Sequence, residues 1–396
     1  MKFDRLSLAV AAAGICTFLN LYTPQAILPS LAAEFGVPLQ RTGLAVTASL
    51  LAVALVAPFA GAVSDRLGRK RLIVGACIAV IVPTLLVAFS RSLESLLIWR
   101  FIQGLILPFI FAVTVAYIGE ELEGPAAIRA AGTYSSGAIL GGFSGRFVAG
   151  VAADWGGWRL GFLAVAALTA IGGLFVAFTL PTEKKFRPMR AGLRATLRGW
   201  REHAANRLLW GTCAVGFGML FSIVATFTFV NFRLAAPPFS LSPGASGGVF
   251  AVYLVGVVTT PVATRFAVKM GRARTAMLAA AVAMAGELLT LAPTLPLVIV
   301  GLAVASAGLF VAQALGLGFI GIAVPRARST AVGLYVSTYY IGGALGGVLP
   351  AGLWHRFGWP GCVALVCVVI AGMGTAAAVT FRERPRGGST VKPVGP

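Results

Sequence analysis

Long apolar runs alternate with short polar breaks along the whole chain. A transmembrane helix needs about 20 mostly apolar residues, and the breaks carry the glycine, proline and charged residues that end helices. Twelve segments meet this requirement, near residues 7–31, 43–63, 72–90, 95–118, 130–152, 160–180, 208–230, 246–267, 275–292, 297–323, 329–352 and 360–381. The pattern predicts an all-α integral membrane protein with twelve transmembrane helices.

The composition excludes most other classes of protein. Of the 396 residues, 58% are hydrophobic and 11% are charged, whereas a soluble domain carries about 25% charged residues. A soluble enzyme, a disordered chain and a disulfide scaffold are therefore excluded. The five cysteines lie in apolar segments without metal-ligand spacing, and the two histidines are isolated. We expect no metal, no cofactor and no catalytic centre, and no ATP-binding G-x-x-x-x-G-K-[ST] sequence occurs.

The basic residues predict the orientation in the membrane. With a cytoplasmic N-terminus, 25 of the 32 lysines and arginines fall on the cytoplasmic side and five on the other, while Arg100 and Arg146 fall inside segments. Lysine and arginine concentrate in cytoplasmic loops. The bias predicts an even number of crossings, both termini in the cytoplasm, and a bacterial-type inner (plasma) membrane location. It also accounts for the net charge of +20 without a nucleic-acid partner.

Four sequence landmarks recur in the second half of the chain, in the same order. Two parallel six-helix repeats are typical of transporters whose binding site lies between them. We therefore divide the chain into an N-terminal six-helix bundle (1–181), a cytoplasmic linker (182–206), a C-terminal six-helix bundle (207–381) and a short cytoplasmic tail (382–396). The paired landmarks are Asp65–Arg71 with Val268–Arg274, Gly104 with Gly308, Leu140–Gly142 with Leu345–Gly347, and Gly157–Trp158 with Gly358–Trp359.

The linker between the two bundles is strongly basic. Met189, Leu193, Leu197 and Trp200 share one helical face, with arginines beside it. This pattern predicts an amphipathic helix that lies on the inner membrane surface. A flexible basic linker is the alternative.

Three motifs resemble signatures of the major facilitator superfamily. GAVSDRLGRKR at residues 61–71 closely matches the loop signature G-x-x-x-D-R-x-G-R-[RK]-[RK], and RFIQG at 100–104 resembles the arginine motif of proton-coupled members. GAILGGFSGR at 137–146 is similar to the antiporter signature G-x-x-x-G-P-x-x-G-G, with Gly142 in place of the proline and Arg146 in place of the last glycine. NLYTPQ at 20–25 and DWGGWR at 154–159 look like the sugar-and-drug efflux branch. The resemblance implies two pseudo-symmetric six-helix bundles.

The first motif is interpreted as part of a gate on the cytoplasmic side. Asp65 can accept hydrogen bonds from an arginine or from a helix N-terminus, and we expect its partner near Ser329. The glycines of the motif permit close backbone approach. The alternative is a topogenic loop, which accounts for the basic residues but not for Asp65. The gating candidates are Gly61, Asp65, Arg66, Gly68 and Arg69.

Two arginines lie inside predicted membrane segments. An arginine at the bilayer centre costs about 2.5–3.5 kcal/mol on insertion scales, so such a residue usually faces a cavity or a partner. Arg100, Gln103 and Arg146 are candidates for coupling or for binding substrate. As alternatives, the two arginines attract an anionic substrate or donate to backbone carbonyls, and Arg100 snorkels to the external surface. Glu287, a carboxylate inside a segment, is expected to snorkel.

The remaining polar residues within segments are candidates for the lining of a central cavity. A polar, mostly uncharged cavity with aromatic residues suits an amphipathic or hydroxyl-bearing solute. For each single residue, ordinary hydrogen bonding between helices is an equal alternative. The candidates are Asn20, Tyr22, Gln25, Tyr134, Asn231, Gln313, Tyr335 and Tyr339.

Glycines spaced four residues apart predict close packing between helices, because small residues let backbones approach. The resemblance implies that helices 5 and 11 pack against the opposite half. We therefore expect these glycines to form surfaces that slide during a rocking motion. The packing candidates are Gly104, Gly137, Gly141, Gly145, Gly342 and Gly346.

These observations predict a secondary active transporter that moves a small organic solute by alternating access. The resemblance implies proton-coupled efflux of a sugar- or drug-like substrate by antiport, although helices 1, 7 and 10 hold no carboxylate. A proton-coupled uptake symporter for an organic anion and a non-transporting membrane receptor are the alternatives. We expect a monomer, not an enzyme, whose partners are the substrate, protons and the lipid bilayer.

Overall fold

The computed structural model describes residues 5–184, 203, 205–324 and 328–382. Every regular element in this part of the chain is a helix. The predicted amphipathic helix around Met189–Trp200 lies outside the described residues.

The first half of the chain forms six membrane-crossing segments. The first combines α1 (Arg5–Tyr22), the 3₁₀ turn η1 (Thr23–Ile27) and α2 (Leu28–Phe35). The next three are α3 (Leu39–Thr42) with α4 (Leu44–Leu67), α5 (Arg69–Ala79) with α6 (Ile81–Ala88), and α7 (Leu93–Ile106) with α8 (Pro108–Glu121). The long α9 (Gly124–Thr179) supplies the fifth and sixth, because its backbone leaves the helical conformation at Gly156 and Gly157.

The second half forms six more segments. They are α11 (Arg207–Ala235); α12 (Pro243–Val249) with η2 (Phe250–Leu254) and α13 (Val255–Met270); α14 (Arg272–Leu289); α15 (Leu295–Ala323); α16 (Arg328–Gly346) with the first part of α17 (Pro350–Thr380); and the remainder of α17 after its break at Gly358. The predicted twelve-helix fold is confirmed. Its boundaries differ most at the predicted span 329–352, where α16 ends at Gly346 and α17 begins at Pro350.

The backbone repeats where the sequence repeats. Gly157 and Gly358, the glycines of the two Gly-Trp landmarks, have φ values of 75° and 62°, and each turns the chain from one crossing into the next. Gly68 and Gly271, in the repeated loop, have φ values of 92° and 83°. L side chains rarely adopt these angles, so glycine is required at all four corners.

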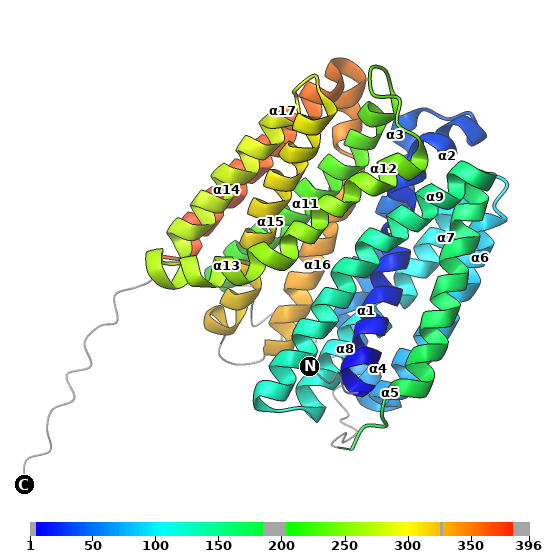
Figure 1. Cartoon of the computed structure of the whole chain (residues 1–396). Helices are drawn as coiled ribbons and strands as arrows, with labels where there is room; N and C mark the ends of the chain where they lie inside the picture. Colours follow the sequence, from blue (N-terminus) through cyan, green and yellow to red (C-terminus); the bar gives the residue numbers. More distant parts are fainter. Residues whose placement is uncertain (1–4, 185–202, 204, 325–327, 383–396) are drawn as a thin grey trace, which may run out of the picture.

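The helices of the two halves stand side by side (Figure 1). The end of the bundle that carries Asp65, Gly124 and Arg207 is the one predicted to face the cytoplasm, and we call it the inner end; the opposite end is the outer end. The halves touch along α4 and α16 and where α12 crosses α9.

The glycine rows pack helices together within each half. A Cβ on Gly141 would meet the Ile15 carbonyl oxygen of α1 at 2.5 Å, and Gly137 and Gly145 lie equally close to the α1 backbone. Gly342 and Gly346 pack in the same way on α11 of their own half. The expectation that these rows slide between the halves is therefore wrong. Different residues of α9 and α16 contact the opposite half, as where Ser337 Oγ donates to the Ala54 carbonyl at 2.7 Å.

Candidate functional site: a cavity between the two halves

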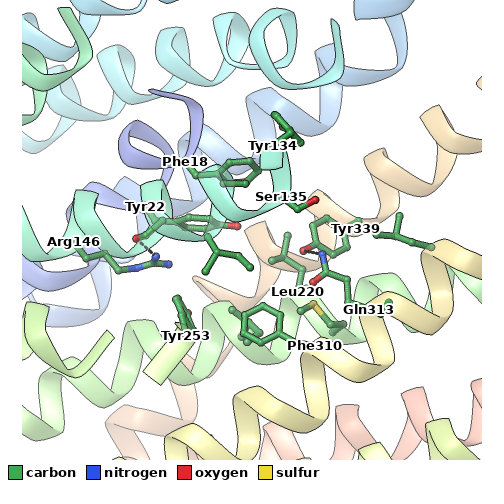
Figure 2. Close-up of a pocket in the computed structure, with 17 residues that line it drawn as sticks. Phe18, Tyr22, Tyr134, Ser135, Arg146, Leu220, Tyr253, Phe310, Gln313 and Tyr339 are labelled. Carbon is green, nitrogen blue, oxygen red and sulfur yellow. Dashed lines mark hydrogen bonds between the residues drawn. The ribbon is translucent and has the colours of Figure 1, made fainter. Parts of the chain in front are cut away.

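A cavity of about 280 Å³ lies between the two halves, near the middle of the bundle. Figure 2 shows its wall, to which α1 and α9 of the first half and α11, η2, α15 and α16 of the second half all contribute. Most of the wall is apolar or aromatic, as in typical small-molecule sites, whose volumes begin near 300 Å³. No aspartate or glutamate is among its lining residues in the described part of the chain.

Four of the predicted lining residues lie in this wall. They are Tyr22, Tyr134, Gln313 and Tyr339. Gln313 Nε2 donates a hydrogen bond of 3.0 Å to the Tyr339 hydroxyl, so the two residues form a polar pair on the second-half side. The neighbouring Ser135 also lines the cavity.

The other four predicted lining residues lie outside the wall. Asn20 is fully buried and donates to Thr169 Oγ1 at 2.9 Å. Gln25 donates to Thr228 Oγ1 at 3.0 Å and so bridges the two halves. Asn231 donates to the carbonyl of Phe227 on its own helix, and Tyr335 packs on Gly216 behind Tyr339. These residues are held by ordinary interhelical and intrahelical contacts.

Arg146 lies in the cavity wall and is 1% exposed. Its guanidinium carbon is 4.4 Å from the centre of the Tyr22 ring and 4.7 Å from those of Phe250 and Tyr253. Nε donates to Gln25 Oε1 at 2.8 Å, and Nη1 donates to the Gly142 carbonyl. The three rings stabilise the buried cation through their electron-rich faces. No carboxylate of the described chain forms a salt bridge with it.

Arg100 is fully buried but does not line the cavity. Its guanidinium donates to the carbonyls of Asn20 (2.8 Å), Leu21 (2.6 Å) and Ala45 (3.0 Å). The carbonyl of Asn20 needs a donor because the residue four positions later is Pro24, which has no backbone N–H. The predicted alternative that Arg100 snorkels to the surface is wrong, and its contacts match the alternative of a donor to backbone carbonyls.

Gln103 joins Arg100 to a buried polar network. Gln103 Oε1 accepts from Arg100 at 2.5 Å, while its Nε2 donates to Thr84 Oγ1 at 2.7 Å. Thr84 in turn donates to Asn20 Oδ1 at 2.8 Å. The network ties α1, α6 and α7 together behind Tyr22. Gly104, the next residue along, lies against the backbone of Ser49 on α4, which lets α7 pack closely on α4.

The outer end of the bundle is closed in this structure. Asp154 of the first half accepts hydrogen bonds from Ser242 Oγ at 2.9 Å and from the Gly244 amide at 3.1 Å, both in the second half. Nearby, Thr47 Oγ1 donates to the Ala344 carbonyl across the halves at 2.8 Å. These contacts seal the cavity on the outer side.

Exposure along the cavity wall increases toward the inner end. Arg146 and Tyr253, on the outer side, are 1% and 6% exposed, whereas Leu317, near the inner end of α15, is 48% exposed. Ser135, near the inner end of α9, is exposed as well. The cavity therefore opens toward the predicted cytoplasm in this conformation.

The predicted gating residues lie at the inner end of the first half. Asp65 forms a 2.6 Å ion pair with Arg69, and Arg69 also pairs with Glu120 of α8. Gly68 makes the corner between α4 and α5, Gly61 has open space beside its backbone, and Arg66 is exposed. The side chain of Ser329, the expected partner of Asp65, lies outside the described residues.

Glu287 is fully buried inside the second half. Thr226 Oγ1 donates to Glu287 Oε1 at 2.6 Å, while Oε2 has no hydrogen-bond partner in the described chain. The expectation that Glu287 snorkels to the surface is wrong, because α15 and α17 pack on α14 and Thr226 of α11 holds the carboxyl group in the interior. The carboxyl group is close enough to Tyr253 of the cavity wall to interact with it electrostatically.

Sequence reasoning missed Tyr253, Phe18 and Phe310 in the wall. Aromatic residues in an apolar segment carry no signal that separates lining from packing or lipid contact. For Tyr253, the sequence does not reveal the 3₁₀ turn η2 between α12 and α13. This turn places the tyrosine beside Arg146. Among the described residues, no cluster of three or more His, Cys, Asp or Glu could hold a metal ion.

Comparison with known proteins identifies the family. The family model described as Major Facilitator Superfamily matches residues 10–256 and 234–396. The chain belongs to the major facilitator superfamily. Members of this family act on small-molecule substrates in membranes. The chain is similar to the inner membrane transport protein YnfM of Escherichia coli (strain K12), with 32% identity over 94% of this chain and 90% of the relative.

Solved structures of the superfamily share the fold. The nucleoside transporter NupG matches 95% of this chain and 100% of its own, with a TM-score of 0.76 and 16% identity. A bacterial homologue of the human lysosomal transporter Spinster, in an inward-facing and unoccupied conformation, matches 96% of this chain and 98% of its own, with a TM-score of 0.75 and 16% identity. At this identity the likeness concerns the fold alone.

Proposed function

We propose that this chain is a secondary active transporter that moves a small organic solute by alternating access. The observation that carries the proposal is the cavity whose wall is divided between the two halves, sealed at the outer end and open toward the inner end. A solute bound there contacts both halves, so a change in their relative tilt changes the side to which it is exposed.

The contacts at the two ends fit a reversible switch between conformations. At the outer end, Ser242 Oγ and the Gly244 amide donate hydrogen bonds to Asp154 of the other half, and these bonds separate without disturbing either helix bundle. At the inner end, the carboxylate of Asp65 pairs with Arg69 of its own half, and it can exchange this partner for one in the second half when the halves approach there. We propose that the Asp65 motif closes the inner side in the outward-open state.

Asp65→Asn is expected to reduce transport by more than about tenfold, because an amide loses the charge-assisted hydrogen bonds that a carboxylate makes. Transport in proteoliposomes and the amount of protein in the membrane are measured together, and the latter should not change. Glu94→Gln, the same chemical change at an exposed site of the outer end (69% exposed side chain), serves as the control. Normal transport by the Asp65 variant would refute the proposed role of Asp65 in closing the inner side.

We further propose that transport is coupled to protons and that Glu287 carries the coupling proton. The carboxyl group is buried without a salt-bridge partner in the described chain, and burial of a lone carboxylate is costly, so its charge depends on the opening of the structure. The groups around it are Thr226 of α11, Tyr253 of η2 and Cys367 of α17. Through Tyr253, the charge of Glu287 influences the cavity next to Arg146.

Glu287→Gln keeps the shape of the side chain and still accepts the hydrogen bond from Thr226, so the variant should fold. We expect solute exchange without a gradient to persist within about twofold, while accumulation driven by an imposed pH gradient is lost. Glu34→Gln, at an exposed ion pair with Arg159, is the control. Unchanged gradient-driven accumulation in the Glu287 variant would exclude this residue as the proton carrier.

The direct test of the function is transport by the purified chain in proteoliposomes, with sugars, organic acids and cationic drugs offered in turn. Proton-coupled efflux predicts that the solute accumulates in inverted membrane vesicles when the lumen is acidic. We favour efflux over uptake because of the glycine motif at residues 137–146. Uptake by symport predicts the opposite dependence on the pH gradient. Absence of transport for every solute class would favour a non-transporting receptor.

A further inference from the structure

The outer end of the cavity holds a cation that no carboxylate of the described chain neutralises. Arg146 is almost fully buried and faces the cavity, yet no carboxylate of the described chain pairs with it. A buried cation without a counter-ion is costly to the fold, because it loses its hydration.

The hydrogen bonds of Arg146 leave part of its binding capacity free. A guanidinium carries five N–H donors. One on Nε is used by Gln25 and one on Nη1 by Gly142. The other three, one on Nη1 and both on Nη2, have no acceptor in the described part of the chain. A purely structural arginine such as Arg100 instead directs its donors to carbonyl oxygens and a side-chain amide.

A second unpartnered group lies beside the guanidinium. The hydroxyl of Tyr253 is buried and has no hydrogen-bond partner in the described chain. Its ring is 4.7 Å from the guanidinium carbon of Arg146, and both residues line the cavity. Native proteins pair nearly all buried polar groups. Within the described chain, Tyr253 and Arg146 therefore bring a hydroxyl without a partner and a cation without a counter-ion to the same part of the cavity wall, which fits a site for an acceptor-rich group that comes from outside the protein.

We propose that Arg146 and Tyr253 form an anion-binding subsite that receives the carboxylate of a small organic acid. This inference rests on the proposed transport function and names its substrate class. The guanidinium N–H groups and the tyrosine hydroxyl donate to the carboxylate oxygens, and the charge of the substrate replaces the missing counter-ion.

The rest of the cavity fits an organic acid with an aromatic or apolar body. Figure 2 places Arg146 and Tyr253 at one end of the cavity and the Gln313–Tyr339 pair at the other. Phe18 and Phe310 line the space between these two polar ends. The apolar body of the solute packs against these rings, and the distal polar pair accepts or donates a hydrogen bond to a substituent.

The specificity of the subsite is tested with acids and their uncharged amides of nearly equal shape. The probes are benzoate and benzamide, cinnamate and cinnamamide, and indole-3-acetate and indole-3-acetamide, titrated into the purified full chain and followed by calorimetry. In at least one pair we expect the acid to bind about tenfold or more tightly than the amide, as a charge-assisted interaction predicts. Equal binding of acid and amide in every pair, or no binding of any acid, overturns the proposal.

Substitutions at Arg146 and Tyr253 test whether these two residues cause the preference for the acid over the amide. Arg146→Gln should reduce the acid-to-amide ratio to near one, and Arg146→Lys should keep a reduced preference because it retains the charge without the planar fork. Tyr253→Phe removes one hydroxyl and should weaken the acid about threefold to tenfold while leaving the amide unchanged. Arg91→Gln, which removes a charge from an exposed site, is the control.

The outcomes distinguish failure of the subsite from failure of the transport function. An acid preference that persists in both Arg146→Gln and Tyr253→Phe overturns the subsite. Transport of neutral or cationic solutes without any effect of Arg146→Lys on selectivity also overturns it, while the transport function stands. If no solute of any class is transported by the wild-type chain, the proposed function itself fails.

Discussion

Arg100→Ala is expected to destabilise the protein by about 2–4 kcal/mol and to reduce transport more than tenfold. The variant removes four hydrogen bonds, to the carbonyls of Asn20, Leu21 and Ala45 and to Gln103. Hydrogen bonds between membrane helices are worth about 0.6 kcal/mol on average and about 1.7 at most. The sum is large for one residue, because Arg100 satisfies two carbonyls just before the interruption of the first segment at Pro24 and also binds α4 through the Ala45 carbonyl.

The loss should reach the cavity through Tyr22, which follows the two α1 carbonyls that Arg100 binds. Thermal unfolding in detergent and transport in proteoliposomes measure the two effects. Arg91→Ala, at an exposed position two residues before the start of α7, should change neither. Equal behaviour of the two variants would contradict the assignment of Arg100 as the residue that holds the interrupted helix.

Gly141→Val is expected to abolish transport and to reduce the yield of folded protein several-fold. A Cβ at this position would lie 2.5 Å from the Ile15 carbonyl oxygen and 2.7 Å from the Ile15 Cα, both backbone atoms of α1. Real Cβ atoms do not approach backbone so closely, so α1 and α9 must separate. Because Tyr22 is on α1 and Arg146 on α9, their separation also disrupts the outer end of the cavity.

Gly132→Val on the same helix is the matched control, because a Cβ there meets nothing within 4 Å. It carries the same cost of a β-branched residue in a helix, and it should leave yield and transport near wild type. Size-exclusion chromatography of detergent extracts and the transport assay compare the pair. Similar losses in both would mean that helix propensity, and not contact with α1, limits position 141.

Several site residues could be selected from the sequence but not sorted by it. Arg100 and Arg146 have the same chemistry and both lie inside apolar segments, and the alternatives for them were substrate binding or donation to carbonyls. The structure sends Arg100 to the α1 backbone and Arg146 into the cavity wall. Whether each arginine binds backbone or lines the cavity depends on its position relative to α1. Because α1 is distant from both arginines in the sequence, the residues around them do not predict this.

The sequence likewise could not predict the surroundings of the Glu287 side chain. A carboxylate in an apolar helix has either a route to the surface or a polar neighbour in the interior, and the choice depends on the helices that pack around it. Here Thr226, 61 residues away, supplies the neighbour. The glycine rows lie against the backbones of α1 and α11, and the sequence does not reveal these partners, since small residues show only that some backbone approaches.

The sequence by itself determined the number of membrane crossings, the internal repeat and the corners at which crossings meet, because lipid imposes an apolar length on every segment and positive φ angles require glycine. It also determined the family. Only the tertiary structure decided which polar side chains share the cavity, which hold helices together and which end of the cavity is closed. Those outcomes depend on contacts between helices distant in the chain, where position in space, and not residue type, decides whether a buried polar group meets a partner.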